Sequence, residues 1–396
     1  MRIAEAFVFP VVVPRRTPFR VAYASRTAAH SILLKLVTAD GIAGWGEAVP
    51  VREVTGEAFS DVWHALKRVA AESLPGLDVS DRDGIRARFA RELARLPSAR
   101  CAVTSALLDL AGRSAGLPAA RLLGGARERV RASVTVGILD LPGTLAAVTA
   151  RLAEGFKDIK LKVGLDPGGD AERVAAVRKE HGTGFRLFLD ANQGFTVPAA
   201  LRFLKAVAGA KVEFCEQPVP APDVDALARV SAESPVPIMA DEAVTGPAAL
   251  ARILERKAAP LVNIKLQKCG GPFEAFSMVL MAESCGVGAM VGCMTETNVG
   301  ITAGLAVALA ASGAKYVDLD GAFDLVDDIV MEGGARLSGG EQYLSPGPGL
   351  ALGVDEGKLA KYADPDPGGS KGPGGSHDPL GSHDPSGAQG PGSVQA

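Results

Sequence analysis

The stretch Ile159-Lys160-Leu161-Lys162-Val163-Gly164 is the first of six apolar segments that each place charged residues at their end. The later segments end in Asp190, Glu216, Asp241, Lys265 and Asp320. From Lys162 to Lys265 these ends lie 24 to 28 residues apart, which suits a strand, a helix and two loops, repeated. Charges that recur at the C-terminal ends of successive strands are typical of the active site of a (β/α) barrel. We therefore predict an α/β protein built on such a barrel.

The domain boundaries follow from the same alternation. Strand patterns at 130–136 and 288–294 complete a set of eight strands, and amphipathic helices separate them. We predict an α+β capping domain over 1–125, the barrel over 126–325, a return to the capping domain over 326–362 and a disordered tail over 363–396. The tail is rich in Gly, Pro and Ser, and it carries too little apolar surface to fold.

Three local features of the pattern are also predicted. Residues 15–29 are polar and basic, and we expect a loop there between two N-terminal strands. Ser98 is predicted as the N-cap of an apolar helix that runs from Cys101 to Ala111. Asp170 is predicted as the N-cap of the helix that follows Lys162.

Composition excludes several classes of protein. The chain has 396 residues, a net charge of −3 and 47% hydrophobic residues. We find no basic surface for nucleic acid and no apolar run of the roughly 20 residues that cross a bilayer. The first residues resemble a strand, so we expect a cytoplasmic enzyme. The five cysteines are scattered without a CxxC pair, and neither a disulfide framework nor a zinc site is expected.

Three carboxylates at consecutive strand ends predict a metal site. Asp190, Glu216 and Asp241 would converge at the mouth of the barrel and would repel one another unless a cation neutralised them. Ligation by oxygen alone favours Mg²⁺, with Mn²⁺ possible, over zinc. A single acid after a strand often caps the next helix, but three at matched positions favour the metal site.

Lysines on two opposite strands indicate the reaction. Lys160 and Lys162 share one face of the second strand, and Lys265 ends the sixth. A substrate bound between them would have a lysine on each side and a metal beneath its oxygen. This arrangement suits proton removal next to a carboxylate, in which a metal stabilises an enediolate and a lysine of lowered pKa takes the proton.

These motifs resemble the enolase superfamily, in its muconate-lactonizing branch. Over residues 1–360 the chain carries, in order, Lys-x-Lys, Asp-Ala-Asn, Glu-Gln-Pro, Ala-Asp-Glu and Asn-Ile-Lys-x-x-Lys-x-Gly-Gly. The resemblance implies a barrel capped by an α+β domain and a homo-oligomer. It implies the following roles: Asp190, Glu216 and Asp241 bind Mg²⁺, Lys162 and Lys265 are the acid–base pair, Lys160 supports the substrate charge, and Asn192, Glu242 and Lys268 support the ligands from behind.

The motifs at the last two barrel strands indicate the class of substrate. Asp318-Leu319-Asp320 and Met294-Thr295-Glu296 resemble the corresponding motifs of the dipeptide epimerases, the L-Ala-D/L-Glu type above all. Two aspartates on one strand face could bind a substrate ammonium group, which muconate and succinylbenzoate lack. We therefore expect a dipeptide substrate whose C-terminal residue is inverted by a two-base 1,1-proton transfer.

The N-terminal loop departs from the Ala-Glu type. Members that act on Ala-Glu hold the glutamate side chain with an arginine, and the comparable position here is Ala24. Arg20 or Arg26 could replace that arginine, and we expect Arg26 to bind substrate. A small or hydrophobic second residue is equally compatible with the loop. Ser133 and Thr135, on the first barrel strand, are further candidates for the pocket, with Thr135 predicted to bind substrate.

Two alternatives are compatible with the same pattern. An N-acylamino acid racemase, an o-succinylbenzoate synthase or a muconate cycloisomerase would keep the fold and change the reaction. A barrel that binds a ligand without catalysis is more remote, because three clustered carboxylates have no evident purpose in binding alone.

Overall fold

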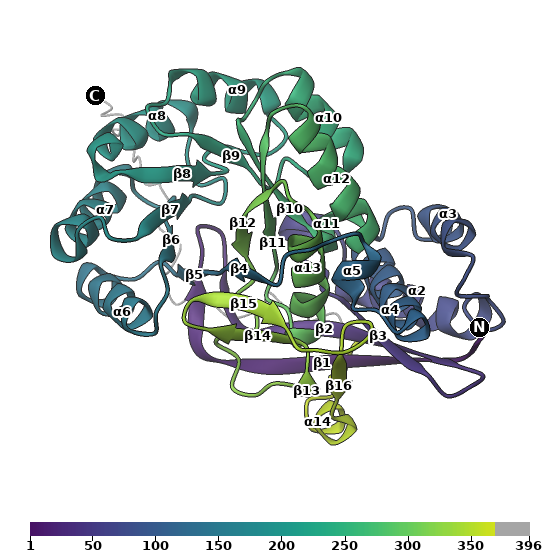
Figure 1. The fold of residues 1–396 in the computed structure, drawn as a ribbon. Helices are drawn as coiled ribbons and strands as arrows, with labels where there is room; N and C mark the ends of the chain where they lie inside the picture. Colours follow the sequence, from purple (N-terminus) through teal and green to yellow (C-terminus); the bar gives the residue numbers. More distant parts are fainter. Residues whose placement is uncertain (369–396) are drawn as a thin grey trace, which may run out of the picture.

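The computed structural model describes residues 1–368 and contains the predicted barrel (Figure 1). Its eight strands are β5 (Ser133–Val136), β6 (Asp158–Lys162), β7 (Arg186–Asp190), β8 (Val212–Glu216), β9 (Ile238–Ala240), β10 (Leu261–Lys265), β11 (Gly288–Gly292) and β12 (Ala314–Asp318). They pair in parallel in this order, each with its neighbour in the chain. The predicted fold class is confirmed.

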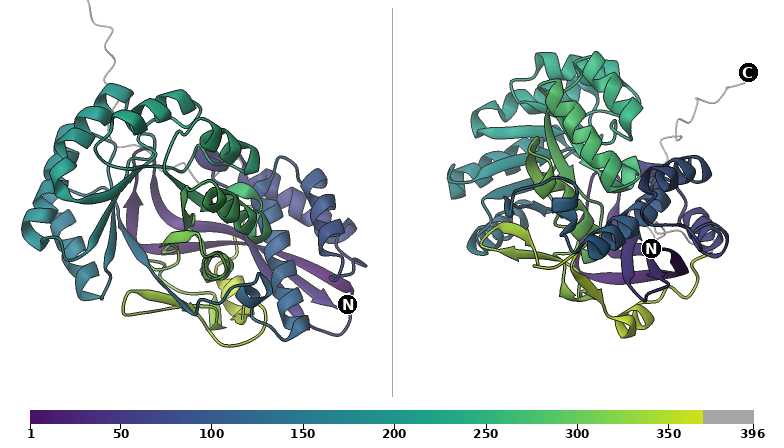
Figure 2. Two further views of the ribbon diagram at one scale, coloured as in Figure 1. Left: turned by 45° about the horizontal axis from the view of Figure 1, so that its top comes forward. Right: turned by 45° about the vertical axis from the view of Figure 1, so that its right-hand side comes forward.

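Helices cover the outside of the barrel, and most residues of its strands are buried (Figure 2). These helices are α6 (Leu141–Ala153), α7 (Pro167–His181), α8 (Val197–Ala206), α9 (Val224–Glu233), α10 (Pro247–Glu255), α11 (Leu266–Cys269), α12 (Pro272–Ser284) and α13 (Asn298–Ala310). Inside the barrel, Phe188, Phe214, Met239 and Met290 form a fully buried cluster. The rings of Phe188 and Phe214 stack with centroids 4.5 Å apart. This plug leaves the C-terminal ends of the strands as the open end.

The barrel is nearly closed, because the hydrogen-bonded order begins at β5 and ends at β12. Side chains bridge the seam between these two strands. The Ser133 hydroxyl donates to the Asp318 carboxylate at 2.7 Å, and the Thr135 backbone N–H donates to Asp320 Oδ2 at 2.6 Å. The predicted strand at 130–136 is in fact two strands, since β4 (Arg129–Arg131) pairs with the C-terminal segment and only β5 joins the barrel.

The N-terminal sheet contains a longer hairpin than the sequence predicts. Strand β1 (Ile3–Arg20) pairs with β2 (Ser25–Thr38), and β2 pairs with β3 (Ala43–Ala48). The expected loop over 15–29 is therefore wrong, and the turn is confined to residues 21–24. The barrel supports the extension: Ile138 N–H donates to the Arg20 carbonyl at 2.9 Å, and Arg16 N–H donates to the Asp324 carbonyl at 2.8 Å.

The rest of the chain's first third is helical and packs against this sheet. The helices are α1 (Arg52–Thr55), α2 (Phe59–Glu72), α3 (Arg82–Glu92), α4 (Pro97–Ala115) and α5 (Ala119–Leu122). The apolar faces of α2, α3 and α4 and the sheet form a second hydrophobic core, separate from the barrel core, whereas the buried residues of α5 belong to the barrel core. In residues 1–368 no helix is long and apolar enough to cross a membrane.

Two predicted N-caps are wrong for one reason, which is a proline at the first helical position. Pro97 begins α4, so Ser98 lies inside the first turn, where its backbone N–H and hydroxyl donate to Glu57 at 3.0 and 2.8 Å. Pro167 begins α7, and Asp166 is the N-cap. Asp170 instead accepts hydrogen bonds from three backbone N–H groups of the preceding loop.

After the barrel the chain returns to the first sheet. This segment contains β13 (Val330–Gly333), β14 (Ala335–Ser338), β15 (Glu341–Leu344), β16 (Leu352–Val354) and α14 (Glu356–Lys361). Val12 N–H donates to the Tyr362 carbonyl at 2.8 Å, and Lys35 pairs with Glu356 at 2.5 Å. Ala363 bridges Val11. The remainder of the predicted tail, residues 369–396, lies outside the described residues.

Candidate active site

Three strands bring the predicted metal ligands to one place at the open end. Asp190 and Glu216 end β7 and β8 and are register partners, and Asp241 follows β9. Their exposed fractions are 0%, 0% and 1%. Each of the three acids follows a short buried apolar segment, so the end of its strand carries it to the mouth of the barrel.

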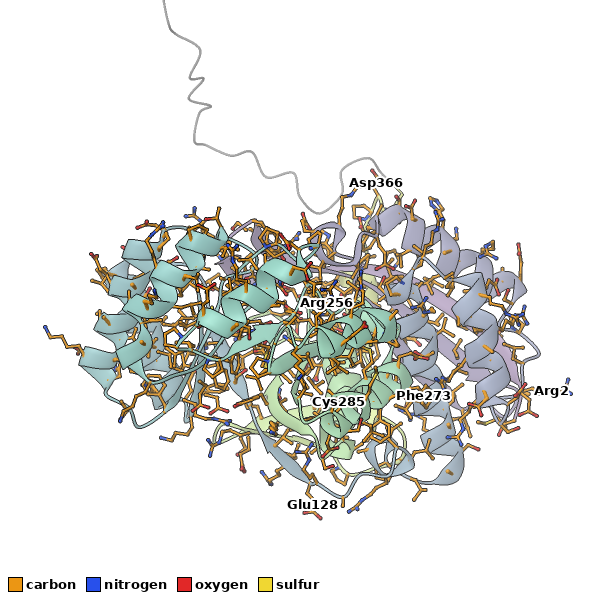
Figure 3. The ribbon with its side chains drawn as sticks, turned by 90° about the horizontal axis from the view of Figure 1, so that it is seen from above. Arg2, Glu128, Arg256, Phe273, Cys285 and Asp366 are labelled. Carbon is orange, nitrogen blue, oxygen red and sulfur yellow. The ribbon has the colours of Figure 1, made fainter. Side chains whose placement is uncertain are left out.

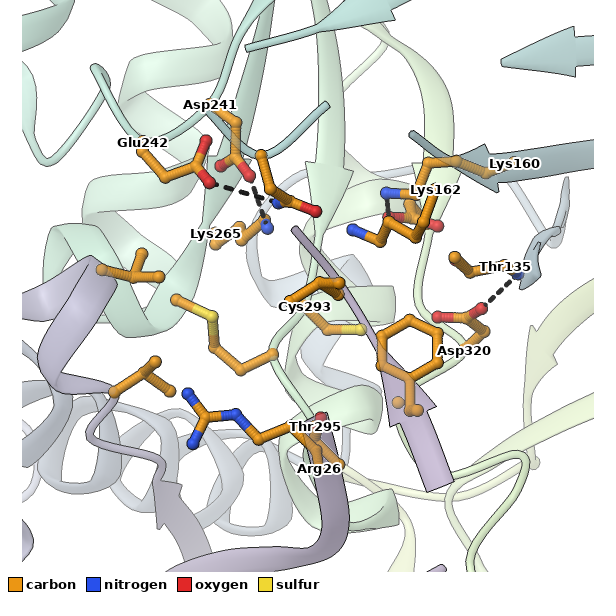
Figure 4. A pocket seen from close by; sticks show the side chains of 18 of the residues that line it. Arg26, Thr135, Lys160, Lys162, Asp241, Glu242, Lys265, Cys293, Thr295 and Asp320 are labelled. Atoms are coloured by element: carbon orange, nitrogen blue, oxygen red, sulfur yellow. Dashed lines mark hydrogen bonds and ion pairs between the residues drawn. The ribbon is translucent and has the colours of Figure 1, made fainter. Parts of the chain in front are cut away.

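Lysines are the partners of these carboxylates. Lys162 Nζ lies 2.5 Å from Asp190 Oδ2, and Lys265 Nζ lies 2.7 Å from Asp241 Oδ2. Lys160 contacts Asp318, and its Nζ lies 3.3 Å from Glu216 Oε2. The two predicted proton carriers, Lys162 and Lys265, approach from opposite strands and point toward one another across the cavity (Figure 4).

Burial and mutual repulsion govern the titration of this cluster. Desolvation, followed by the negative charge of Asp190, raises the pKa of Glu216 to about 8. Burial alone would lower the pKa of Lys265, but the charges of Asp241 and Glu216 raise it well above its usual range. The lowered lysine pKa predicted from the sequence depends on a metal ion beside the lysine and stays a prediction.

The donor set fits a hard divalent cation. In residues 1–368 no group of three Asp, Glu, His or Cys side chains is arranged so that it could hold a metal ion. The carboxylates of the site are oriented toward lysines instead. Their chemistry nevertheless suits Mg²⁺: three buried carboxylates supply only oxygen, and each one already faces positive charge. The cation would balance the negative charge of the carboxylates, which the lysine ammonium groups now balance.

The residues predicted to support the ligands lie in two different places. Lys268 is behind Asp241: its ammonium contacts both the carboxylate and the backbone carbonyl of Asp241, and it lies 3.1 Å from the Asn263 carbonyl. Asn192 and Glu242 line the cavity themselves. Asn192 Nδ2 donates to Glu242 Oε1 at 3.2 Å, and one further oxygen of each is buried with no partner among the described residues.

The cavity contains most of the predicted substrate-binding residues and several that the sequence did not indicate. The predicted substrate-binding residues that line it are Lys160, Thr135, Met294, Thr295, Asp318, Asp320 and Arg26. The additional lining residues are Arg15, Phe19, Val21, Tyr23, Val51, Val54, Cys293, Gly321 and Asp324. Most of these come from the β1–β2 hairpin and from the segment around α1, where no sequence motif marks them. Of the cysteines, Cys293 is at the site, whereas Cys285 is on the outer surface (Figure 3).

The two aspartates at the eighth strand differ in their surroundings. Asp318 is 4% exposed and is already engaged by Lys160 and Ser133. Asp320 contacts Thr135, and burial and the neighbouring charge of Asp318 raise its pKa. Asp320 is therefore the carboxylate better placed to receive a cationic group from the cavity.

Glu296 does not line the cavity. Its carboxylate accepts hydrogen bonds from Met294 N–H at 2.9 Å and from Gln267 Nε2 at 3.3 Å. Glu47 of the first sheet lies beside it and receives hydrogen bonds from Ser31, Thr297 and Gly300. Burial, and then the charge of Glu47, raises the pKa of Glu296 to about 8. These two buried carboxyls join the capping sheet to the loop after β11.

Replacing Glu296 with Gln should change the dependence of stability on pH. The folded protein holds this proton more tightly than the unfolded chain, whose carboxyl titrates near 4.5, so stability falls as pH rises from 4.5 to about 8. Because one pKa unit corresponds to about 1.4 kcal/mol, the shift from 4.5 to about 8 means that Glu296→Gln should raise the free energy of unfolding at pH 8 by as much as about 5 kcal/mol. Urea titrations at pH 5 and pH 8 measure this, with exposed Glu180→Gln as control. An equal pH dependence in both variants would contradict the raised pKa of Glu296.

Comparison with known proteins now places the chain in a family. Residues 3–124 match the N-terminal domain model of the mandelate racemase and muconate lactonizing enzymes, and residues 144–358 match the enolase C-terminal domain-like model. The chain belongs to the enolase superfamily, as the resemblance predicted.

Individual relatives are isomerases. The chain is 36% identical to an L-Lys-D/L-Arg epimerase from Methylococcus capsulatus, over 89% of this chain and 99% of the relative. It is similar to the substrate-liganded L-Ala-D/L-Glu epimerase of Bacillus subtilis, with 33% identity and a TM-score of 0.87 over 90% of this chain and all of that one. It is also similar to the N-succinyl Arg/Lys racemase of Bacillus cereus, with 30% identity and a TM-score of 0.88 over 92% and 98% of the two chains.

Proposed function

We propose that the protein is a Mg²⁺-dependent dipeptide epimerase that inverts the α-carbon of the C-terminal residue. The single observation that carries the proposal is the pair Lys162 and Lys265, on opposite strands, with Asp320 at the edge of the cavity between them. The similarity to two dipeptide epimerases supports it. A cytoplasmic location and a homo-oligomeric state belong to the proposal on the grounds of sequence and family resemblance alone.

The carboxylates and the lysines of the site have separate roles in the proposed reaction. Asp190, Glu216 and Asp241 would hold Mg²⁺, which supplies the positive charge that makes the proton next to a carboxylate acidic. One of Lys162 and Lys265 removes the α-proton from its face, and the other delivers a proton to the opposite face. Lys160 stays among the carboxylates of Glu216 and Asp318 and adds positive charge below the reacting centre.

Asp320 distinguishes a dipeptide from an N-acyl amino acid. Its carboxylate faces the cavity and would pair with the ammonium group of the first residue. An N-acyl substrate has no such cation, and an N-succinyl group would add a second anion near the carboxylate. The racemase is therefore the second candidate function, supported by the similarity to the N-succinyl Arg/Lys racemase.

Replacing Asp320 with Asn should separate these two functions. Losing a charge-assisted hydrogen bond to the ammonium costs about 1.5–3 kcal/mol, so kcat/KM for a dipeptide should fall about ten- to hundredfold. Steady-state kinetics with Ala-Ala and with an N-succinyl amino acid measure this, and the exposed Asp225→Asn variant is the control. An undiminished dipeptide activity would contradict the role of Asp320 in binding the ammonium group, and an activity confined to N-succinyl substrates would favour the racemase.

The pocket for the second side chain is predicted to be apolar. By resemblance, this side chain contacts the β1–β2 hairpin, and Val51, Val54 and Met294 line that part of the cavity. Arg26 Nη2 lies 2.9 Å from Glu53 Oε2, so its charge is already balanced. We therefore propose a small or hydrophobic second residue rather than glutamate.

The defining experiment is isotope exchange. The protein, Mg²⁺ and a library of dipeptides are incubated in D₂O, and the gain in mass of each dipeptide is measured. Exchange in no dipeptide at all would leave a binding protein as the better description, whereas exchange without metal would contradict the dependence on Mg²⁺. The pattern of second residues that exchange would define the apolar pocket.

A further inference from the structure

Arg15 is a buried cation in the cavity that the proposed chemistry does not use. It lies on β1, in the part of the hairpin that packs against the chain just after β12, and its backbone bridges Leu325. Its side chain is 7% exposed and lines the same cavity as Lys162, Lys265 and Asp320. Guanidinium groups seldom lie so deep without a purpose, because an underpaired buried charge is costly.

The pairing of Arg15 is incomplete. Its Nη2 lies 3.5 Å from Asp324 Oδ2, and its Nε has no hydrogen-bond partner among the described residues. Asp324 is mainly the partner of another residue, since Arg151 Nη2 binds both of its oxygens at 2.9 and 2.8 Å. The Phe19 ring, 4.9 Å from the guanidinium, covers one side of Arg15 without accepting a hydrogen bond.

The other carboxylate near Arg15 is Asp320. Burial lowers the pKa of Arg15, and the negative charges of Asp320 and Asp324 only partly offset that effect. In the proposed function Asp320 binds the substrate ammonium group. Asp324 would then be the remaining partner of Arg15. Arg151, which also pairs with Glu154 at 3.1 Å, already binds both oxygens of Asp324, so Arg15 would lack a full partner.

The geometry of the substrate places its first side chain in this region. The α-carbon of the second residue lies between the two lysines, and the ammonium of the first residue lies at Asp320. The first side chain branches from the carbon that bears this ammonium, so its neighbours are the lining residues around Asp320. These neighbours are Arg15, Phe19, Thr135, Gly321 and Asp324.

We propose that the first residue of the substrate is acidic, Asp or Glu, and that Arg15 binds its side-chain carboxylate. The inference rests on the proposed epimerase function and extends it to the substrate class. A carboxylate accepts hydrogen bonds from a guanidinium in the planar geometry that suits both groups. An apolar first side chain would leave Arg15 underpaired, and a lysine or arginine side chain would add a third cation beside Arg15 and Arg151.

The experiment compares first residues at a constant second residue. Glu-Ala, Asp-Ala, Gln-Ala, Ala-Ala and Lys-Ala are incubated with the full chain and Mg²⁺ in D₂O, and kcat/KM for α-proton exchange is measured. A charge-assisted hydrogen bond of the usual strength predicts that Glu-Ala or Asp-Ala exceeds Ala-Ala by about ten- to hundredfold. Lys-Ala should be the poorest substrate, and Gln-Ala should be intermediate.

Variants of Arg15 test whether the preference comes from this residue. Arg15→Met should reduce the ratio of Glu-Ala to Ala-Ala to about one, and Arg15→Lys should retain part of it. A folding defect would lower both substrates alike and leave the ratio unchanged. Arg16→Met is the matched control, because Arg16 is exposed, donates only a 3.4 Å hydrogen bond to the Phe323 carbonyl by its side chain and does not line the cavity.

The outcomes separate this inference from the function on which it rests. Exchange without a preference for acidic first residues, or a preference that survives Arg15→Met, would overturn the assignment of Arg15 alone. Absence of exchange with every dipeptide would overturn the epimerase function and the assignment together.

Discussion

Replacing Lys162 or Lys265 with Met should abolish inversion while preserving α-proton exchange for one stereoisomer. In a two-base reaction each lysine serves one face of the α-carbon. The variant that lacks one lysine can still remove a proton with the other and return deuterium to the same face. Inversion should fall by about 10²–10⁴-fold, the usual contribution of a positioned acid or base.

The measurement uses both stereoisomers of one dipeptide in D₂O. Lys162→Met should exchange one of them and Lys265→Met the other, each without change of configuration; the exposed Lys179→Met is the control. If both variants exchanged the same stereoisomer, or if both still inverted it, the two lysines would not be the opposed pair. The complementary pattern would also identify the lysine that acts on each stereoisomer.

Removing one carboxylate should abolish both catalysis and the effect of Mg²⁺ on stability. A ligand present at 100 times its Kd stabilises the folded protein by about 2.7 kcal/mol. We expect a gain of this order when Mg²⁺ is added to the parent protein and almost none for Glu216→Gln, whose amide is a poorer ligand. Thermal unfolding with EDTA and with Mg²⁺ measures this without reference to activity.

The control for the carboxylate variant is Asp225→Asn, an exposed surface substitution. It should respond to Mg²⁺ as the parent protein does. A full Mg²⁺ response in Glu216→Gln would mean that the cation binds elsewhere. Exchange of α-protons in the presence of excess EDTA would contradict the metal-dependent reaction itself.

The strand-end residues were predictable because local sequence determines them. Asp190, Glu216 and Lys265 each end an apolar run, and a parallel barrel brings such ends together whatever the loops do. The helix starts were less predictable, since Ser98 and Asp170 are sound capping residues displaced by a proline one or three positions earlier.

Contacts between distant segments account for the remaining differences. Glu296 follows two cavity residues but does not line the cavity, because Met294 N–H and Gln267 hold its carboxylate near Glu47 of the first sheet. Arg15 belongs to a basic run that suggests a solvated loop, yet the segment after β12 buries its side chain. Neither partner is visible in a local window of the sequence, so the lining of the substrate pocket required the three-dimensional structure.

At the seam between β5 and β12, the same aspartates contribute to substrate specificity and to the closure of the barrel. The aspartates that face the ligand also replace the missing backbone ladder, since Ser133 and Thr135 donate to them across the gap. In a related protein, a substitution of Asp318 that altered substrate specificity would also remove the hydrogen bond from Ser133. A second substitution would then have to restore the contact between β5 and β12. Divergence should therefore proceed more easily through the hairpin and Arg15, which are attached to the rim of the barrel, than through its eighth strand.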